Sequence, residues 1–86
     1  MKLFYRIPPE KYREIMNQIR ERFEMHEEED EDKIILMLDD DSRIVKVTGS
    51  FMPGEDEVAS VKVVLEDKSL RPDFDSILGS PFKIRK

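Results

Sequence analysis

The run Glu27-Glu-Glu-Asp-Glu-Asp-Lys-Ile-Ile-Leu-Met-Leu-Asp-Asp-Asp41 sets the layout of this chain, because a short apolar segment stands between two acidic ones. Ile34 to Leu38 is too short for a separate helix, and its unbroken apolar character predicts a central strand buried on both faces. The acids on either side must then lie at the two ends of that strand.

The residues before this run predict a strand followed by an amphipathic helix. Lys2 to Ile7 alternates between apolar and polar faces, and Pro8 and Pro9 end the strand. We then expect a helix of about four turns. It would pack on the sheet through one apolar stripe, made by Tyr12, Ile15, Met16, Ile19 and Phe23. The only histidine, His26, is expected at the C-terminus of this helix, where a partly charged imidazole suits the helix dipole.

The residues after the run predict a hairpin, a further strand and a short helix. Asp39 to Ser42 has the composition of a turn, since Asp and Ser side chains bond to nearby backbone N–H groups. Arg43 to Ser50 and Val58 to Leu65 alternate as strands, and a turn at Met52 to Glu55 separates them. A short helix follows from the apolar positions Phe74, Ile77 and Leu78, with Gly79 as its stop, and an edge strand is expected at residues 81–85.

We therefore predict a single acidic domain of the α+β class over residues 1–86. Its element order is β-α-β-β-β-α-β, with a mostly antiparallel sheet packed on one long N-terminal helix and one short C-terminal helix. A chain of this length buries only about 60 to 65 percent of its unfolded surface, so no deep substrate cleft is expected.

The composition indicates a cytoplasmic protein. Cysteine is absent, so disulfides and thiolate metal sites are excluded. The first apolar stretch is too brief for a signal peptide, and no apolar run approaches the roughly 20 residues that span a bilayer, so no membrane partner is expected. Many charged residues with one Asn and one Gln are typical of hyperthermophiles.

The net charge of −5 conceals a segregation along the chain. Residues 1–26 carry a net charge of +2, residues 27–67 carry −10, and residues 68–86 carry +3. Binding to nucleic-acid phosphates requires several Lys or Arg on one surface. We interpret the cations of the terminal segments as partners of the acidic middle, so direct nucleic-acid binding is not expected.

The topology predicts two acidic poles, because loops of an antiparallel sheet alternate between its two ends. Oxygen-rich sites without His or Cys suit hard cations, and irregular carboxylate sets favour Ca²⁺ over Mg²⁺. The spacing of an EF-hand loop is not met. The candidate metal ligands at the first pole are Glu27, Glu28, Glu29, Asp30, Glu31 and Asp32 with Glu55, Asp56 and Glu57, and those at the second pole are Asp39, Asp40, Asp41, Glu66 and Asp67.

No catalytic signature is present in the sequence. The serines lack a G-x-S-x-G context, the glycines are scattered, and one histidine makes no triad. Carboxylate pairs in exposed loops lack the shielded pocket that acid and base catalysis needs. We expect a non-enzymatic protein whose aromatic residues fill the core.

The order of strand, Ile7-Pro-Pro-Glu10 helix, acidic segment and meander with an Asp39-Asp-Asp41 turn resembles a group of small acidic α+β proteins from methanogenic archaea. The resemblance covers most of the chain and is one of layout. It implies a compact, stable domain with calcium binding at acidic loops and no assigned cellular role.

Two functions remain open at this point. In the first, the chain is a small non-enzymatic domain that binds divalent cations, with Ca²⁺ preferred, through its acidic loops. In the second, the same negative surface is an interaction module that docks on a basic protein partner, such as a nucleic-acid-binding protein whose phosphate track it imitates.

Overall fold

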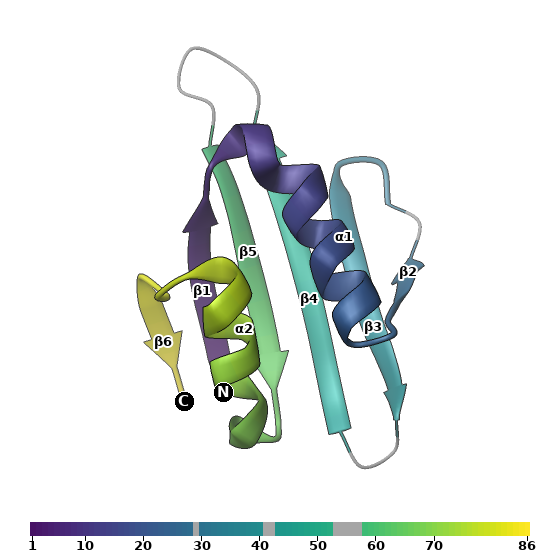
Figure 1. Cartoon of the computed structure of the whole chain (residues 1–86), viewed down its shortest axis with the longest axis vertical. Helices are drawn as coiled ribbons and strands as arrows, with labels where there is room; N and C mark the ends of the chain where they lie inside the picture. Colours follow the sequence, from purple (N-terminus) through teal and green to yellow (C-terminus); the bar gives the residue numbers. More distant parts are fainter. Residues whose placement is uncertain (29, 41–42, 53–57) are drawn as a thin grey trace.

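The structure, a computed structural model, describes residues 1–28, 30–40, 43–52 and 58–86. It is an α+β fold in which six antiparallel strands form one sheet and two helices lie on one face of it (Figure 1). The sheet order is β2-β3-β4-β5-β1-β6. The elements are β1 (Lys2–Ile7), α1 (Tyr12–Arg22), β2 (His26–Glu28), β3 (Lys33–Asp40), β4 (Arg43–Met52), β5 (Val58–Leu65), α2 (Arg71–Leu78) and β6 (Lys83–Arg85).

Alternation of apolar and polar side chains places the core between the sheet and the helices. In β1 the side chains of Leu3, Tyr5 and Ile7 are buried, and in β5 every second residue from Ala59 to Leu65 is buried. The two strands pair with Leu3 opposite Val63, so their buried faces coincide. The predicted faces of both strands are confirmed.

Helix α1 packs on the sheet through the predicted stripe, with Tyr12, Ile15, Met16 and Ile19 buried. A close approach to β4 depends on Gly49: a Cβ there would lie 2.8 Å from the hydroxyl oxygen of Tyr12. At the other end of the helix, Phe23 stacks on Phe74 of α2 with ring centroids 4.4 Å apart, which joins the two helices. The glycine thus makes room for the first turn of α1, and the aromatic pair holds its last turn.

The helical segments differ less in length than predicted. A 3₁₀ turn at Pro9–Lys11 leads into α1, and another at Lys68–Leu70 leads into α2. With these turns included, the helices have 14 and 11 residues, so the predicted contrast between a long and a short helix is not confirmed.

The structure corrects four predictions around the acidic run. Residues 26–28 form β2, an additional strand paired with β3, so Glu27 and Glu28 are not in a loop and His26 is not at a helix end. Strand β3 is next to the sheet edge, and only Leu36 of its described side chains is fully buried. In the part of the chain that the structure describes, no helix covers the second face of the sheet. Asp39 and Asp40 belong to β3 and pair with β4 rather than forming a turn.

Candidate functional site

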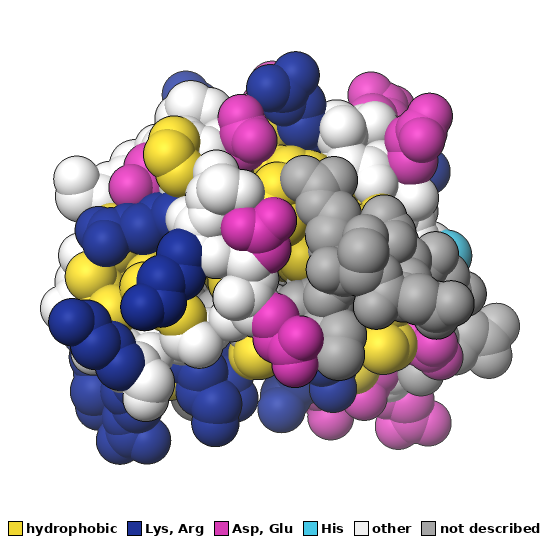
Figure 2. Space-filling view, turned by 90° about the horizontal axis from the view of Figure 1, so that it is seen from below, with side chains coloured by type: hydrophobic (Ala, Val, Ile, Leu, Met, Phe, Trp, Pro, Cys, Tyr) yellow, Lys and Arg dark blue, Asp and Glu magenta, His cyan; other side chains and the backbone are white. Residues whose placement is uncertain are grey.

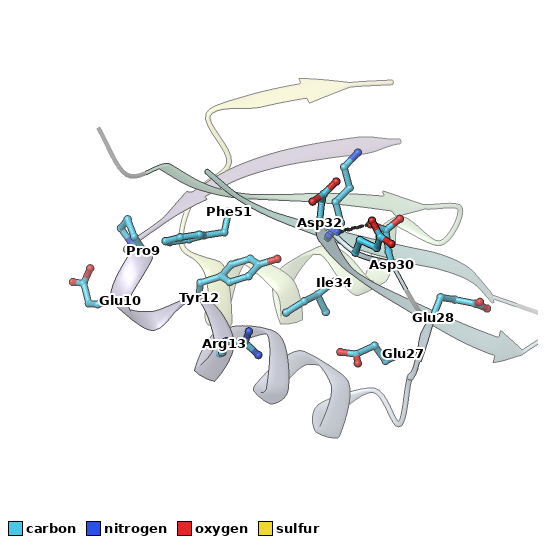
Figure 3. Close-up of a pocket in the computed structure, with 12 residues that line it drawn as sticks. Pro9, Glu10, Tyr12, Arg13, Glu27, Glu28, Asp30, Asp32, Ile34 and Phe51 are labelled. Atoms are coloured by element: carbon cyan, nitrogen blue, oxygen red, sulfur yellow. Dashed lines mark hydrogen bonds between the residues drawn. The ribbon is translucent and has the colours of Figure 1, made fainter. Parts of the chain in front are cut away.

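A groove lies between the start of α1, the segment that connects β2 to β3, and the last residues of β4 (Figure 3). We call it the acidic groove. It is lined by six carboxylate side chains, Glu10, Glu27, Glu28, Asp30, Glu31 and Asp32, by two cationic ones, Arg13 and Lys33, and by the less exposed Pro9, Tyr12, Ile34 and Phe51. Carboxylates from two segments that are distant in sequence thus surround an apolar floor.

The floor of the groove is built on an aromatic pair. Tyr12 from the first turn of α1 lies beside Phe51 of β4, with ring centroids 5.8 Å apart and the ring planes inclined at 35° (Figure 3). Burial raises the pKa of the Tyr12 hydroxyl, and the nearby Glu27 carboxylate acts in the same direction, while a hydrogen bond with the Ile34 backbone and the charge of Arg13 oppose it. The hydroxyl is therefore neutral at physiological pH.

Asp30 holds the connection between β2 and β3. Its carboxylate oxygen Oδ1 accepts hydrogen bonds from the backbone N–H groups of Asp32, at 3.0 Å, and Lys33, at 3.1 Å. This is the Asx type of turn that Asp favours. One of the predicted ligands therefore shapes the loop through one carboxylate oxygen, although it is exposed like its neighbours Glu31 and Asp32.

The two glutamates of β2 lie on opposite faces of the sheet. Glu27 is opposite Leu36 and so lies on the helix side, where it faces the groove, whereas Glu28, which also borders the groove, is opposite Ile35 and by alternation belongs to the other face. A carboxylate oxygen of Glu28 is 3.4 Å from Nε2 of His26, which shares its face. The strand thus spreads acids that are adjacent in sequence over both faces.

The second predicted pole is divided between the end of β3 and the segment that follows β5. Glu66 and Asp67 follow β5 at the end of the sheet where Asp40 pairs with Arg43. Asp67 begins the turn before α2, since its Oδ1 accepts hydrogen bonds from the backbone N–H and hydroxyl of Ser69, at 3.0 and 2.6 Å. The remaining predicted ligands, Glu29, Asp41, Glu55, Asp56 and Glu57, lie outside the described residues.

Among the residues that the structure describes, no three His, Cys, Asp or Glu side chains gather into a group that could hold a metal ion. The carboxylates of the acidic groove line a shared surface without converging on one point. Calcium binding at these loops stays a prediction from sequence.

Sequence reasoning missed Glu10, Tyr12 and Phe51 as parts of this site. The sequence assigns both aromatic residues to the core, Tyr12 through the apolar stripe of the predicted helix and Phe51 through its position beside the predicted turn. The signal that could have found them is topological: the helix begins after Pro8 and Pro9, which follow β1 at the same end of the sheet as the start of β3.

Comparison with protein-family models, with curated protein sequences and with solved structures found no match for this chain. Of the helices that the structure describes, neither has the length and apolar character required to cross a membrane.

Proposed function

We propose that this protein is a non-enzymatic binding domain whose acidic groove receives a basic segment of a partner protein. The observation that carries the proposal is the combination of six carboxylates with the Tyr12 and Phe51 rings in one groove. A purely solvated acidic loop would not require an aromatic floor contributed by other elements.

The chemistry of the groove suits a guanidinium or ammonium group on a flexible stem. The apolar stem of Arg or Lys can lie on the aromatic floor while its charged end reaches a carboxylate. Arginine fits best because its planar guanidinium stacks on aromatic faces and also binds carboxylates through two parallel hydrogen bonds. Each exposed ion pair contributes about 0.2 to 1 kcal/mol, so several contacts are needed for measurable affinity.

The exposure of the carboxylates supports a binding role over a catalytic one. Glu27, Glu28, Glu31 and Asp32 are all exposed. Acid and base catalysis relies on burial and close like-charge pairs to separate the pKa values of two carboxyl groups. An open groove with exposed acids is better suited to electrostatic recognition, which raises the rate of encounter with a cationic partner.

A titration of the isotopically labelled protein with a hexa-arginine peptide, followed by backbone amide shifts, tests the proposal. We expect saturable shifts at residues 9–13 and 27–34, and weaker binding as salt is added. The double variant Glu27→Gln, Glu31→Gln should bind up to about tenfold more weakly, since it removes two ion pairs. Asp30 is left intact because it holds the connection between β2 and β3.

The matched control is the double variant Glu21→Gln, Glu66→Gln, which removes two exposed carboxylates that do not line the groove. It should bind the peptide like the unmodified protein. If the control weakened peptide binding equally, the loss of affinity would be caused by the change in net charge, and the proposed site at the groove would be contradicted. Titration with millimolar Ca²⁺ and Mg²⁺ separates the other candidate function: saturable shifts with Ca²⁺ alone would favour the calcium hypothesis.

A further inference from the structure

The face of the sheet that the helices leave uncovered is cationic across its four neighbouring strands β4, β5, β1 and β6. None of these strands contains an Asp or Glu residue. Their alternation places six cations on the uncovered face, and we call this surface the basic face: Lys2, Arg6, Lys46, Lys62, Lys83 and Arg85. Viewed from below, Lys and Arg side chains gather around hydrophobic ones on the left, toward β6 (Figure 2).

The register aligns these cations in rows across the strands. One row runs from Lys83 through Phe4 and Lys62 to Thr48, because each residue is opposite the next. The adjacent row runs through Arg85, Lys2, Val64 and Lys46. Neighbouring strands are about 4.8 Å apart, so each row crosses the face over roughly 15 Å.

The cations of the basic face lack carboxylate partners among the residues that the structure describes. Two arginines on the helix side do have them: Arg22 pairs with Asp73 at 3.2 Å and Arg71 with Asp75 at 3.3 Å. The interpretation that the terminal cations neutralise the acidic middle is therefore wrong for these pairs, since both lie within the terminal segments. The positive charge of the basic face is therefore not neutralised by any described carboxylate.

Two aromatic rings lie among these cations. Phe82 is 54% exposed, although it is a large apolar residue, and its ring centroid is 6.4 Å from that of the half-buried Phe4. The guanidinium carbon of Arg6 lies 4.7 Å from the centroid of Phe82, and Nζ of Lys83 lies 5.8 Å from the centroid of Phe4. These contacts hold the cations beside the rings.

A shallow hollow beside Phe82 completes the surface. Hydroxyl groups from β4 and β5 line it at Thr48, Ser50 and Ser60, together with Lys46 and Lys62. Lys33 and the carboxylate residue Asp30 lie at its β3 side, so the cationic surface ends there. Hydroxyl groups and ammonium groups are both hydrogen-bond donors to phosphate oxygens.

We propose that the basic face binds single-stranded nucleic acid. Single strands are bound by cations that follow the backbone and by aromatic side chains on which bases stack, often on the open face of a sheet. The exposed Phe82 distinguishes this ligand from an acidic peptide, which has charge but no bases to stack. A duplex fits less well, because its bases are already stacked on one another.

The sequence argues against a nucleic-acid ligand by assigning the terminal cations to the acidic middle, but the fold separates the two signs of charge. The acids line the groove and the β2 side of the sheet, whereas the only charged residues of β4, β5, β1 and β6 are Lys and Arg. Local potential rather than average charge governs the approach of a polyanion. The two surfaces share a border at Asp30 and Lys33, but the residues substituted to test each proposal lie outside that border, so either proposal can fail alone.

Fluorescence anisotropy with a labelled oligothymidylate of about twelve nucleotides tests the proposal. We expect binding that weakens with salt, with a logarithmic slope of at most about −4 for six cations. The variant Lys46→Gln, Lys62→Gln should bind roughly tenfold more weakly and reduce the slope by about 1.4. Phe82→Leu keeps an apolar side chain but removes the ring, and should weaken binding about fivefold or more.

The matched control is Lys11→Gln, Lys68→Gln, which removes the same charge from the turns before the two helices. It should bind like the unmodified protein, and thermal melting confirms that every variant is folded. No binding at low salt, equal weakening by the control, or unchanged binding by Phe82→Leu would overturn the proposal. The proposal would also be wrong if duplex DNA or a poly-glutamate peptide bound more tightly than the oligonucleotide. Dimerisation that excludes the oligonucleotide would show instead that the basic face binds a second copy of the chain.

Discussion

Tyr5 is the buried residue whose chemistry has the clearest consequence for the stability of the domain. Its side chain is fully buried, and its hydroxyl donates a hydrogen bond of 2.7 Å to Oδ1 of Asp75. Burial raises the pKa of this hydroxyl, and the hydrogen bond and negative charge of Asp75 raise it further. Arg71 pairs with the same carboxylate, at 3.3 Å, so strand β1 is joined to helix α2 through one acid.

The raised tyrosine pKa values predict that the domain loses stability in alkaline solution. In the unfolded chain Tyr5 and Tyr12 ionise near pH 10, but in the folded protein they keep their protons to higher pH. Their contribution is therefore complete below about pH 10 and is lost as the pH rises toward the folded values. Urea unfolding should show a decline of up to about 1.4 kcal/mol per pH unit for each tyrosine.

The variant Tyr5→Phe separates the two parts of this effect. It should lower the free energy of unfolding by about 1.5 kcal/mol near neutral pH, because the hydrogen bond to a charged group is lost. Its alkaline decline should also be less steep, since one titrating group is gone. A decline as steep as that of the unmodified protein would show that Tyr5 does not carry the effect.

Glu24 is strained by its place after helix α1. Its φ angle is 51°, and it is the only described residue other than glycine with a positive φ. The N–H of Met25 donates to the carbonyl of Arg20, at 2.9 Å, and that of Glu24 donates to Glu21, at 3.4 Å, which is the Schellman pattern that usually has glycine at this position.

Replacing Glu24 by glycine should therefore stabilise the protein. We expect Glu24→Gly to raise the free energy of unfolding by about 0.5 to 1 kcal/mol in urea denaturation, because the left-handed conformation costs glycine little. Glu21→Gly is the control with the same change of charge. It lies inside the helix and should lower the stability by about 1 kcal/mol. If Glu24→Gly and Glu21→Gly both lowered the stability, the backbone strain proposed at Glu24 would be contradicted.

At the scale of elements, the strands with alternating side chains and the apolar helix stripe could be predicted from the sequence. Tyr5 and Val61 lie on the buried faces that their alternation indicated. Strand β2 could not be predicted in this way, because His26, Glu27 and Glu28 are all exposed and have no apolar alternation. These residues form a strand because they pair with β3. A local sequence pattern does not show which segment will pair with a given strand.

The connection between β2 and β3 should depend on Asp30. Replacing it by alanine removes the acceptor of two backbone hydrogen bonds, so β2 should open more often while the core stays intact. Hydrogen exchange at the amides of residues 26–28 should become faster in Asp30→Ala, and Asp30→Asn, which keeps a side-chain acceptor, should largely restore protection. Equal exchange in all three proteins would mean that the turn does not depend on this side chain.

At the scale of the whole molecule, the sequence shows that the charges are segregated along the chain. It does not show where the acidic and the basic residues gather on the folded surface. The acidic groove requires Glu10 and the run from Glu27 to be near each other, and the basic face requires β6 to pair with β1. Both depend on the spatial order of the strands, which short-range patterns do not contain. The segment charges therefore indicated the wrong partners for Arg22 and Arg71.

We infer that one small sheet carries two binding surfaces, an acidic groove and a basic face, which share only the border at Asp30 and Lys33. Backbone amide shift mapping of one labelled sample, with hexa-arginine and oligothymidylate added separately, tests it most directly. We predict that the peptide shifts residues 9–13 and 27–34, and that the oligonucleotide shifts residues 2–6, 46–50, 60–64 and 82–85. Overlapping sets of shifted residues, or no saturable shift with either ligand, would contradict the account.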